Sequence, residues 1–210
     1  VFLSLPNGQA QKIIKKTYKF KNLKYIDLSA DFRITKPDIY YKNYRKIHIA
    51  KNLIKESLYS ISEFNKKKIN KFRIISNPGC YPTSIQLALV PIIKKNLISL
   101  SEITIDSKSG YSGAGKNLKK KFKHKNIYSS TFAYAVNHHR HICEIDQELK
   151  NKTGKKVKFT FNPHLLPTYR GLLSSIYVKL KPNSSAKKIR NELINFYKKN
   201  KFVKNLKLNS

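Results

Sequence analysis

The sequence is poor in four kinds of residue: it has no methionine, no tryptophan, two cysteines and only 11 acidic residues among its 210. Two cysteines cannot form the disulfide framework of a small secreted domain, and they fit a reducing, cytoplasmic setting. No apolar run approaches the length of a membrane span, and the N-terminus lacks the pattern of a signal peptide. These absences predict a cytoplasmic protein without a membrane partner. The missing initiator methionine leads us to expect a fragment.

Positive charge is abundant: 44 lysines and arginines against 11 acidic residues give a formal net charge of +33. Such a balance is typical of nucleic-acid-binding modules. The lysines, however, are spread along the whole chain, and arginine, the preferred residue for bidentate base and phosphate contacts, is scarce. Lys, Asn, Ile and Tyr have AT-rich codons, so a biased genome accounts for the composition. We therefore expect no specific nucleic-acid partner; strong binding that falls steeply with salt would indicate one.

The first part of the chain has the pattern of a parallel α/β fold. Val1–Leu5, Tyr25–Leu28 and Arg73–Ser76 are short apolar runs typical of buried strands, and Gln9–Lys16 has helical character. Ile34 to Ser57 is polar and aromatic, without a clean period. The third strand runs directly into a loop, Asn77–Cys80, that carries a candidate reactive residue, as expected at the carboxyl end of a parallel strand.

The pattern changes near Asn77, where we place a domain boundary. Beyond it, alternation of apolar and polar residues predicts strands, and apolar residues at helical spacing predict helices. The strands are expected at residues 103–107, 157–161 and 175–180, and the helices at 142–149 and after a capping Ser184. The second part is therefore predicted to be an antiparallel or mixed sheet that carries helices.

Cys80 stands directly before an apolar run, Ser84–Ile93, that is typical of a helix. Pro82 suits the first helical turn, where a missing N–H costs little. A thiol at that point faces unpaired backbone N–H groups and the positive end of the helix dipole, which favour the nucleophilic thiolate. The alternative is a small buried residue after a Pro-Gly turn.

Residues 137–145 hold half of the six histidines in the chain. Histidine is the commonest acid/base partner of a cysteine nucleophile. A metal site built from His139, His141 and Cys143 is the competing hypothesis, but zinc ligands usually come from two segments and no second cluster exists, so we predict no metal. A solvated, histidine-rich helix start is the structural alternative.

Two further segments have the composition of anion sites. Ser109–Lys116 is rich in glycine and can form a nest of backbone N–H groups, although it lacks the Walker spacing and is a weak signal. Phe161–Gly171 contains His164 and Arg170 between prolines. Arg170 can bind a carboxylate or phosphate bidentately, whereas the structural alternative is a rigid loop around a buried histidine.

Taken in order, these motifs resemble those of the N-acetyl-γ-glutamyl-phosphate reductases, relatives of aspartate-semialdehyde dehydrogenase, over essentially the whole chain. The resemblance is carried by Val1–Gly8, Asp27–Arg33, Tyr59–Glu63, Asn77–Thr83, Ser107–Lys116, His139–Ile145, Pro163–Leu165 and Arg170–Gly171. The chain departs from the family at three of these positions, with Asn7 in place of histidine, Lys116 in place of arginine and Cys143 in place of proline. The family's Gly-x-x-Gly-x-x-Gly motif is absent.

The resemblance implies an α/β fold in two parts. Residues 1–77 would be the remainder of a dinucleotide-binding domain, a partial Rossmann-type parallel sheet whose first βαβ unit is missing. Residues 78–210 would be an α+β catalytic domain of the type found at the C-terminus of glyceraldehyde-3-phosphate dehydrogenase, with its last stretch missing. Relatives are homo-oligomers, so a dimer or tetramer is expected of the intact protein.

The resemblance also implies an activity and its residues. Cys80 would attack the acyl phosphate of N-acetyl-glutamyl phosphate, and NADPH would reduce the thioester to the semialdehyde, a step of arginine biosynthesis. The acid/base would be His141, with His139 as the second choice. Anionic groups of the substrate would be bound by residues of four segments, namely Arg140, Arg170, Asn77 and His164. The cofactor NADP(H) would lie against the glycine-rich loop at Ser112, Gly113, Ala114 and Gly115.

Several alternatives stay open. A truncated remnant without activity would keep the catalytic motifs yet lack the cofactor motif, and we expect this polypeptide alone to bind NADPH poorly. An aspartate-semialdehyde dehydrogenase-like reductase would use the same nucleophile. A papain-like hydrolase also has a cysteine ahead of a helix and a later histidine, His141 or His164, but its signature differs from Gly79–Pro82.

Overall fold

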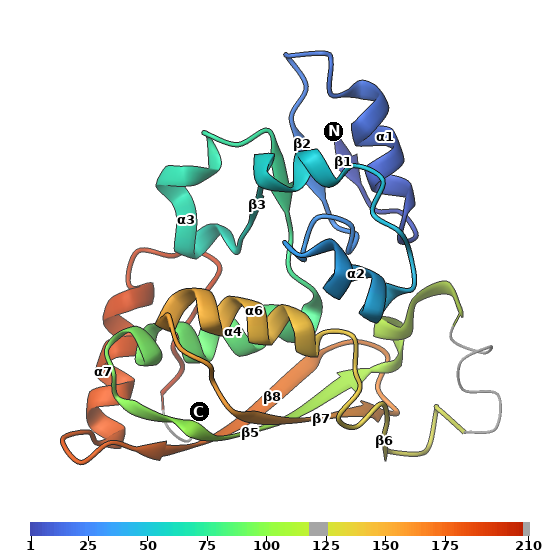
Figure 1. The fold of residues 1–210 in the computed structure, drawn as a ribbon. Coiled ribbons are helices and arrows are strands. Elements are labelled where there is room, and N and C mark those ends of the chain that lie inside the picture. Colours follow the sequence, from blue (N-terminus) through green and yellow to red (C-terminus); the bar gives the residue numbers. More distant parts are fainter. Residues whose placement is uncertain (118–125, 208–210) are drawn as a thin grey trace. The chain divides into compact units, whose positions relative to one another are not determined.

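The computed structural model describes residues 1–117 and 126–207, and side chains only up to Ala114 on the first side of that gap (Figure 1). The chain divides into two compact units, Val1–Gly79 and Cys80–Ser210, beside the boundary that the sequence places near Asn77. Within the described residues no helix is both long and apolar enough to cross a membrane.

Unit 1, Val1–Gly79, is built on a parallel sheet in the strand order β1-β2-β4-β3. Its strands are β1 (Phe2–Leu3), β2 (Tyr25–Asp27), β3 (Ser57–Tyr59) and β4 (Ile74–Ser76). Its helices are α1 (Gln9–Thr17), α2 (Pro37–Tyr44), α3 (Ser62–Ile69) and the 3-10 turn η1 (Lys51–Glu56). The parallel α/β prediction is confirmed.

Elements α2 and η1 lie in the stretch 34–57, for which the sequence predicts no regular structure, and β3 begins at its last residue. Helix α2 is short and buries only Tyr40 and Tyr44, which are one turn apart. Its apolar face therefore consists of a single pair of residues. Pro37 at its start supplies the only strong helix signal. Too few buried positions were present to reveal a period.

Asp31 organises the interior of unit 1. Its carboxylate accepts hydrogen bonds from the main-chain N–H groups of Gly8 at 2.7 Å and Gln11 at 3.0 Å. N–H groups at the start of a helix such as α1 have no carbonyl partner within the helix. The hydroxyl of Tyr40 donates to the same carboxylate at 2.6 Å. Asp31 is fully buried, so a residue from beyond β2 caps α1 in place of a local side chain.

Unit 2, Cys80–Ser210, is built on a mixed sheet in the order β6-β7-β5-β8, in which β5 runs parallel to β7 and antiparallel to β8. Its strands are β5 (Ile98–Gly110), β6 (Phe132–Ala133), β7 (Phe159–Leu166) and β8 (Leu172–Leu180). Its helices are α4 (Cys80–Lys94), α6 (Ile142–Thr153), α7 (Ala186–Tyr197) and the 3-10 turn η2 (Tyr111–Asn117). The prediction of a mixed sheet carrying helices is confirmed.

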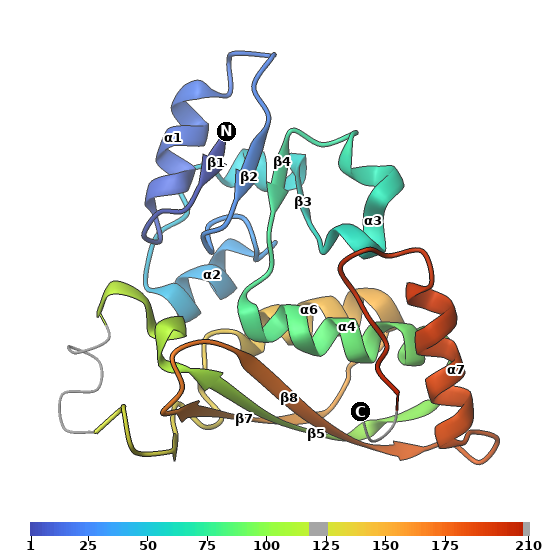
Figure 2. The ribbon, with the colours of Figure 1, turned by 180° about the vertical axis from the view of Figure 1, so that it is seen from behind.

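Helices α4 and α6 lie on one face of this sheet, as both views of the ribbon show (Figures 1 and 2). Strand β5 alternates accordingly: Ile103 and Ile105 are buried against the helices, whereas Asp106 and Lys108 are half-exposed on the opposite face. The core between helices and sheet consists mainly of isoleucine, leucine and aromatic side chains. This core holds α4 in a fixed position on the sheet.

Two local expectations need correction in unit 2. Strand β7 runs from Phe159 to Leu166 rather than over 157–161, so it includes Pro163. The cap of α7 is Ser185, whose side chain accepts from the N–H of Lys188, and not Ser184. Ser185 has the extended backbone that an N-cap requires, which places its hydroxyl over the first turn.

Candidate active site

Cys80 is the first residue of α4 and its side chain is exposed. The alternative of a small buried cysteine is therefore wrong. The helix begins four residues earlier than the apolar run indicates, with Pro82 inside the first turn, where a missing N–H leaves no hydrogen bond unmade. A thiol at this terminus lies at the positive end of the helix dipole, a setting that stabilises the thiolate.

A cavity of about 370 Å³ opens beside Cys80 within unit 2. It is lined by Cys80, Tyr81, Ser109, Gly113, Ala114, Tyr134, Ala135, His138, His139, Arg140, His141 and Leu165. The structure therefore brings the cysteine of α4, the glycine-rich turn after β5 and the His-Arg-His segment before α6 to one space. These are three of the segments that the sequence predicts to contain catalytic or anion-binding residues.

The two histidines of the motif contact each other, with ring centroids 4.8 Å apart. The main-chain N–H of His141 donates to Nδ1 of His139 at 3.1 Å, so neutral His139 carries its proton on Nε2. The Nε2 atom of buried His141 lies 3.8 Å from a carboxylate oxygen of Glu144, which is fully buried. A carboxylate beside an imidazole orients the ring and stabilises its protonated form.

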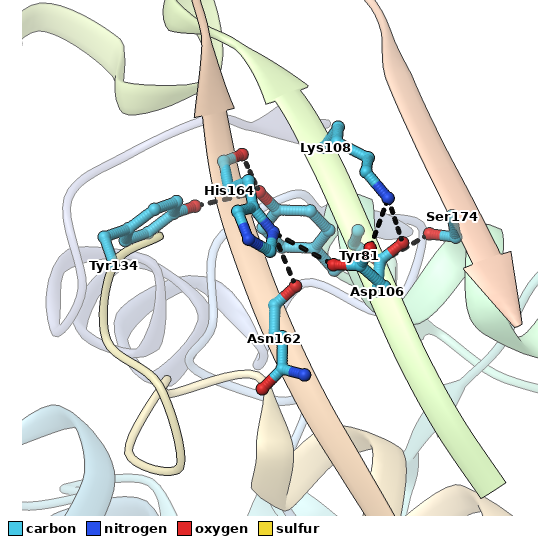
Figure 3. Close-up of polar contacts among 8 residues, drawn as sticks. Tyr81, Asp106, Lys108, Tyr134, Asn162, His164 and Ser174 are labelled. Atoms are coloured by element: carbon cyan, nitrogen blue, oxygen red, sulfur yellow. Dashed lines mark hydrogen bonds and ion pairs between the residues drawn. The ribbon is translucent and has the colours of Figure 1, made fainter. Parts of the chain in front are cut away.

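Tyr134 lines the cavity although nothing in the sequence pattern singles it out. Its hydroxyl lies 3.0 Å from that of Tyr81, the residue after the cysteine (Figure 3). Burial raises the pKa of both phenols, so both are protonated at neutral pH and act as hydrogen-bond donors. A tyrosine five residues before the His139–His141 motif is no recognisable signal, because the contact depends on how the loop folds.

The glycine-rich segment turns sharply at the end of β5. The N–H of Tyr111 donates to the carbonyl of Thr168 at 2.9 Å, and Gly110 is required there because a Cβ atom would lie 2.8 Å from the same oxygen. The N–H of Ser112 donates to the carbonyl of Tyr169 at 3.0 Å. The turn is therefore held against the β7–β8 connection.

Of the four expected cofactor residues, Gly113 and Ala114 line the cavity. Ser112 lies beside them in η2 but is not among the lining residues. Gly115 belongs to the same turn, and its exposure lies outside the described side chains. A Cβ atom at Gly113 would lie 2.8 Å from Oγ of Ser109, so a larger residue there would force this hydroxyl to move.

Three expected substrate residues do not line this cavity. His164 pairs through Nδ1 with the carboxylate of Asp106 at 3.0 Å (Figure 3). Its neighbour in β7, Leu165, lines the cavity, and successive side chains of a strand point to opposite faces. Arg170 is exposed, with its guanidinium 5.3 Å from the ring centroid of Tyr169. Only Arg140 of the expected substrate residues is in the cavity lining.

Asn77, the fourth expected substrate residue, belongs to unit 1. Its N–H donates to the carbonyl of Asp27 at 2.8 Å, and its carbonyl accepts from Nε of Arg33 at 2.8 Å. The two main-chain groups of Asn77 are thus tied to the last residue of β2 and to the segment that follows this strand. The contacts fix the end of β4, three residues before the cysteine.

The second cysteine has a different setting. Burial, with the nearby Glu144 carboxylate, raises the pKa of the Cys143 thiol to about 12. Its Sγ donates to the main-chain carbonyl of Arg140 at 3.0 Å. No group of three or more His, Cys, Asp or Glu side chains in the described part of the chain could hold a metal ion, so the hypothesis of a site at His139, His141 and Cys143 gains no support.

Comparison with known sequences identifies relatives of both units. The sequence model of the family described as "Semialdehyde dehydrogenase, dimerisation domain" matches residues 80–210. A protein of Brachyspira hyodysenteriae named N-acetyl-gamma-glutamyl-phosphate reductase is 44% identical over 216 residues, which cover 99% of this chain and 61% of that protein. One of the same name from Afipia carboxidovorans is 40% identical over 204 residues, covering 97% and 58%. The chain thus spans about three fifths of these relatives.

Solved structures show the same fold at low sequence identity. Aspartate-semialdehyde dehydrogenase II of Vibrio cholerae aligns with a TM-score of 0.62 and 14% identity over 90% of this chain and 58% of that one. The Candida albicans aspartate-semialdehyde dehydrogenase solved with NADP aligns with a TM-score of 0.58 and 14% identity over 91% and 54%. The expected fold class, α/β with a parallel and a mixed sheet, is confirmed.

Proposed function

The chain belongs to the semialdehyde dehydrogenase family, and on this premise we propose that it is the catalytic part of an NADPH-dependent reductase in arginine biosynthesis. The substrate is N-acetyl-glutamyl 5-phosphate and the product is the 5-semialdehyde. The names of its sequence relatives support this substrate. The observation that carries the proposal is the single cavity shared by Cys80 and the His-Arg-His segment.

Cys80 acts as the nucleophile. Its thiolate forms a bond to the acyl carbon, the bond from that carbon to the phosphate oxygen breaks, and inorganic phosphate leaves with the electron pair. The product of this half-reaction is a thioester on Cys80. The position at the start of α4 favours the reaction because the helix terminus stabilises the thiolate both before attack and after its release.

His141 is the acid/base of the reaction. It takes the proton of the Cys80 thiol and returns a proton to the departing phosphate, while the Glu144 carboxylate, 3.8 Å away, stabilises the imidazolium between the two events. His139 lines the same cavity and is the second choice. Arg140, which also lines it, supplies positive charge for the anionic groups of the substrate. Asn77, His164 and Arg170 stay predicted substrate residues.

The turn at Gly113 and Ala114 fits a nicotinamide ring, since it presents a residue without a side chain at the cavity wall and a Cβ atom there would lie 2.8 Å from Ser109. When bound, NADPH supplies the hydride that reduces the thioester carbonyl, releasing the aldehyde and the Cys80 thiolate. Ser112 and Gly115 would flank this contact. The NADP named for the Candida albicans structure agrees with this cofactor.

The description of the matched family as a dimerisation domain supports a homo-oligomer. We place the enzyme in the cytoplasm because both described cysteines are free thiols, one of them proposed to be catalytic. No feature of the cavity calls for a nucleic-acid ligand.

The first half-reaction tests the proposal without NADPH. The chain is mixed with N-acetyl-glutamyl phosphate, and released phosphate and the mass of each cysteine-containing peptide are measured. We expect one phosphate per chain and an N-acetyl-glutamyl adduct on Cys80. The Cys143→Ser variant should behave alike and Cys80→Ser should release none.

Phosphate release that survives Cys80→Ser, or an unmodified Cys80 after the reaction, would contradict the proposal. A parallel reaction with β-aspartyl phosphate separates this enzyme from an aspartate-semialdehyde dehydrogenase. The acetylated substrate should acylate Cys80 faster, and the reverse order would assign the site to the aspartyl compound.

A further inference from the structure

Tyr81, the residue directly after the nucleophile, has no role in the proposed chemistry, yet it is among the most buried residues of the chain at 1% exposure. It lies in the first turn of α4 and is part of the wall of the Cys80 cavity. Three parts of Tyr81, namely the ring, the hydroxyl and the main-chain carbonyl, are held by contacts with different elements of unit 2.

The ring of Tyr81 is packed against both imidazoles of the motif. Its centroid lies 5.4 Å from that of His139 and 6.0 Å from that of His141, both in edge arrangements. Phe161 of β7 contacts it from a further direction at 5.3 Å. A rigid, buried aromatic ring in edge contact with both imidazoles prevents either from moving toward it, so the ring sets the distance of both histidines from α4.

The hydroxyl of Tyr81 reaches the far side of the site. It lies 3.0 Å from the hydroxyl of Tyr134, and it donates to the main-chain carbonyl of His164 at 3.4 Å (Figure 3). These contacts tie the first turn of α4 to the segment that precedes the histidine motif and to β7. Since burial raises the pKa of Tyr81, the hydroxyl keeps its proton for this bond.

The carbonyl of Tyr81 is the end of a chain of serine hydroxyls. Ser84 Oγ donates to this carbonyl at 3.0 Å, so its single proton is used. Ser174 Oγ, 2.7 Å away, must therefore donate to Ser84, and Ser107 Oγ, 2.7 Å from Ser174, must donate to Ser174. The direction of every bond follows from the first. The chain links β5 through β8 to the first turn of α4.

Three hydroxyls between a helix and a sheet are costly unless each is hydrogen-bonded, and an apolar contact would pack as well. Complete polar chains of this kind fix one relative orientation of the elements they join. Here the fixed quantity is the rotation of the α4 terminus about its axis. That rotation decides where the Cys80 thiol points.

We propose that Tyr81 is a positioning residue that sets the Cys80 thiol and the two imidazoles at one fixed spacing, and that Ser174 acts through it. The inference rests on the proposed function of Cys80. All of its contacts lie within unit 2. The pairing of thiol and imidazole should therefore be present in this 210-residue chain, whether or not it binds NADPH.

The test is the pH profile of Cys80 alkylation by iodoacetamide, followed by mass spectrometry so that Cys143 is counted separately. In the unmodified chain a thiolate–imidazole pair keeps the rate high at about pH 6, where an ordinary thiol reacts slowly. Tyr81→Phe removes the hydroxyl but keeps the ring. We expect it to lower the rate at about pH 6 by about fivefold, the effect of losing one net hydrogen bond, with the rate at about pH 9.5 unchanged.

Ser174→Ala should lower the same low-pH rate by about threefold, and Ser174→Thr, which keeps the hydroxyl, should restore it. Two matched controls lie on β8: Ser175→Ala is the neighbouring serine, and Tyr177→Phe alters a tyrosine that is 62% exposed. Both should leave the profile unchanged. Thermal unfolding followed by circular dichroism verifies that each variant is folded at the temperature of the assay.

The outcomes separate the two claims. An ordinary thiol profile in the unmodified chain, slow at about pH 6 and rising steeply toward about pH 9.5, would contradict the proposed role of Cys80 itself. A high rate at about pH 6 that Tyr81→Phe and Ser174→Ala leave equal to the controls would overturn the positioning role alone. Equal losses at low and high pH in these variants would also overturn it, because general loosening of the helix affects both.

Discussion

A polar cluster in unit 1 and a polar cluster in unit 2 have opposite arrangements. In unit 1 the Asp31 carboxylate is fully buried and is saturated by donors from Gly8, Gln11 and Tyr40. In unit 2 the Cys80 thiol is exposed at the wall of a cavity, beside two imidazoles. A closed cluster holds a fold in place, whereas an open one leaves a reactive atom accessible. Motifs of equal prominence in the sequence thus do different work.

The histidines repeat this contrast. His48 in unit 1 donates from Nε2 to the carbonyl of Asp31 at 2.8 Å and accepts at Nδ1 from the N–H of Ala50 at 3.3 Å. Both nitrogens of its neutral form are used, and burial lowers its pKa. His141 instead has a carboxylate beside it and faces a cavity. Only the second arrangement suits proton transfer.

Removing the centre of the closed cluster should have the largest effect. Asp31→Ala leaves three donors without an acceptor, two of them buried and the Gly8 N–H partly buried, and we expect unit 1 to lose about 4 kcal/mol of stability. Urea unfolding and hydrogen exchange of the α1 amides measure this loss. Asp38→Ala, an exposed acidic residue of α2, is the control. Should Asp31→Ala unfold no earlier than this control, the cluster would not have the structural role assigned to it.

The open cluster should respond in reactivity and not in stability. His141→Asn is expected to slow acylation of Cys80 by about 100-fold, which corresponds to about 2.7 kcal/mol. His139→Asn should slow it less, because the Glu144 carboxylate lies 3.8 Å from His141 and is placed to stabilise the imidazolium of that residue. Single-turnover phosphate release measures both. A larger loss in His139→Asn would move the acid/base role to that residue.

Acidification should distinguish the clusters as well. His48 has a lowered pKa in the folded chain, so the unfolded chain takes up its proton first. Its contribution to stability is present above about pH 6.5 and is lost as the pH falls below that value, with a slope of at most about 1.4 kcal/mol per pH unit. Urea unfolding of unit 1 at several pH values measures the slope. His48→Gln should flatten it, and an unchanged slope in this variant would rule out His48 as its source.

The smallest effect is expected at the other cysteine. Cys143→Ser keeps a donor for the carbonyl of Arg140, which accepts from Sγ at 3.0 Å, and should change stability by less than about 1 kcal/mol and acylation by less than about twofold. A thermal unfolding curve and the phosphate-release assay measure these changes. A large loss of acylation would give Cys143 a part in the site.

The sequence predicted much of the open cluster because its signals are local. A cysteine before a helix with Pro82 in its first turn, and three histidines within residues 138–141, are recognisable without knowledge of the fold. The closed cluster could not be assigned in this way. Asp31 contacts Gly8 and Gln11, which are 23 and 20 residues away, so its capping role follows only from the packing of β2 beside α1.

Strand register is the second feature of the fold that could not be predicted from the sequence. The sequence assigns His164 to the substrate, whereas in β7 it is Leu165 that lines the cavity and His164 that pairs with Asp106. A proline normally argues against a strand, so the extent of β7 through Pro163 could not be predicted. Its register, with His164 opposite Lys108, is set by pairing with β5.

The most direct measurement compares the two cysteines inside one molecule. The chain is treated with a limited amount of iodoacetamide at about pH 6, and the modified fraction of Cys80 and Cys143 is counted by mass spectrometry. Since the Cys143 thiol has a pKa raised to about 12 and Cys80 lies at an open helix terminus, Cys80 should be modified almost completely before Cys143 reacts. Equal modification of the two, or earlier modification of Cys143, would contradict the claim that the cavity of unit 2 activates Cys80.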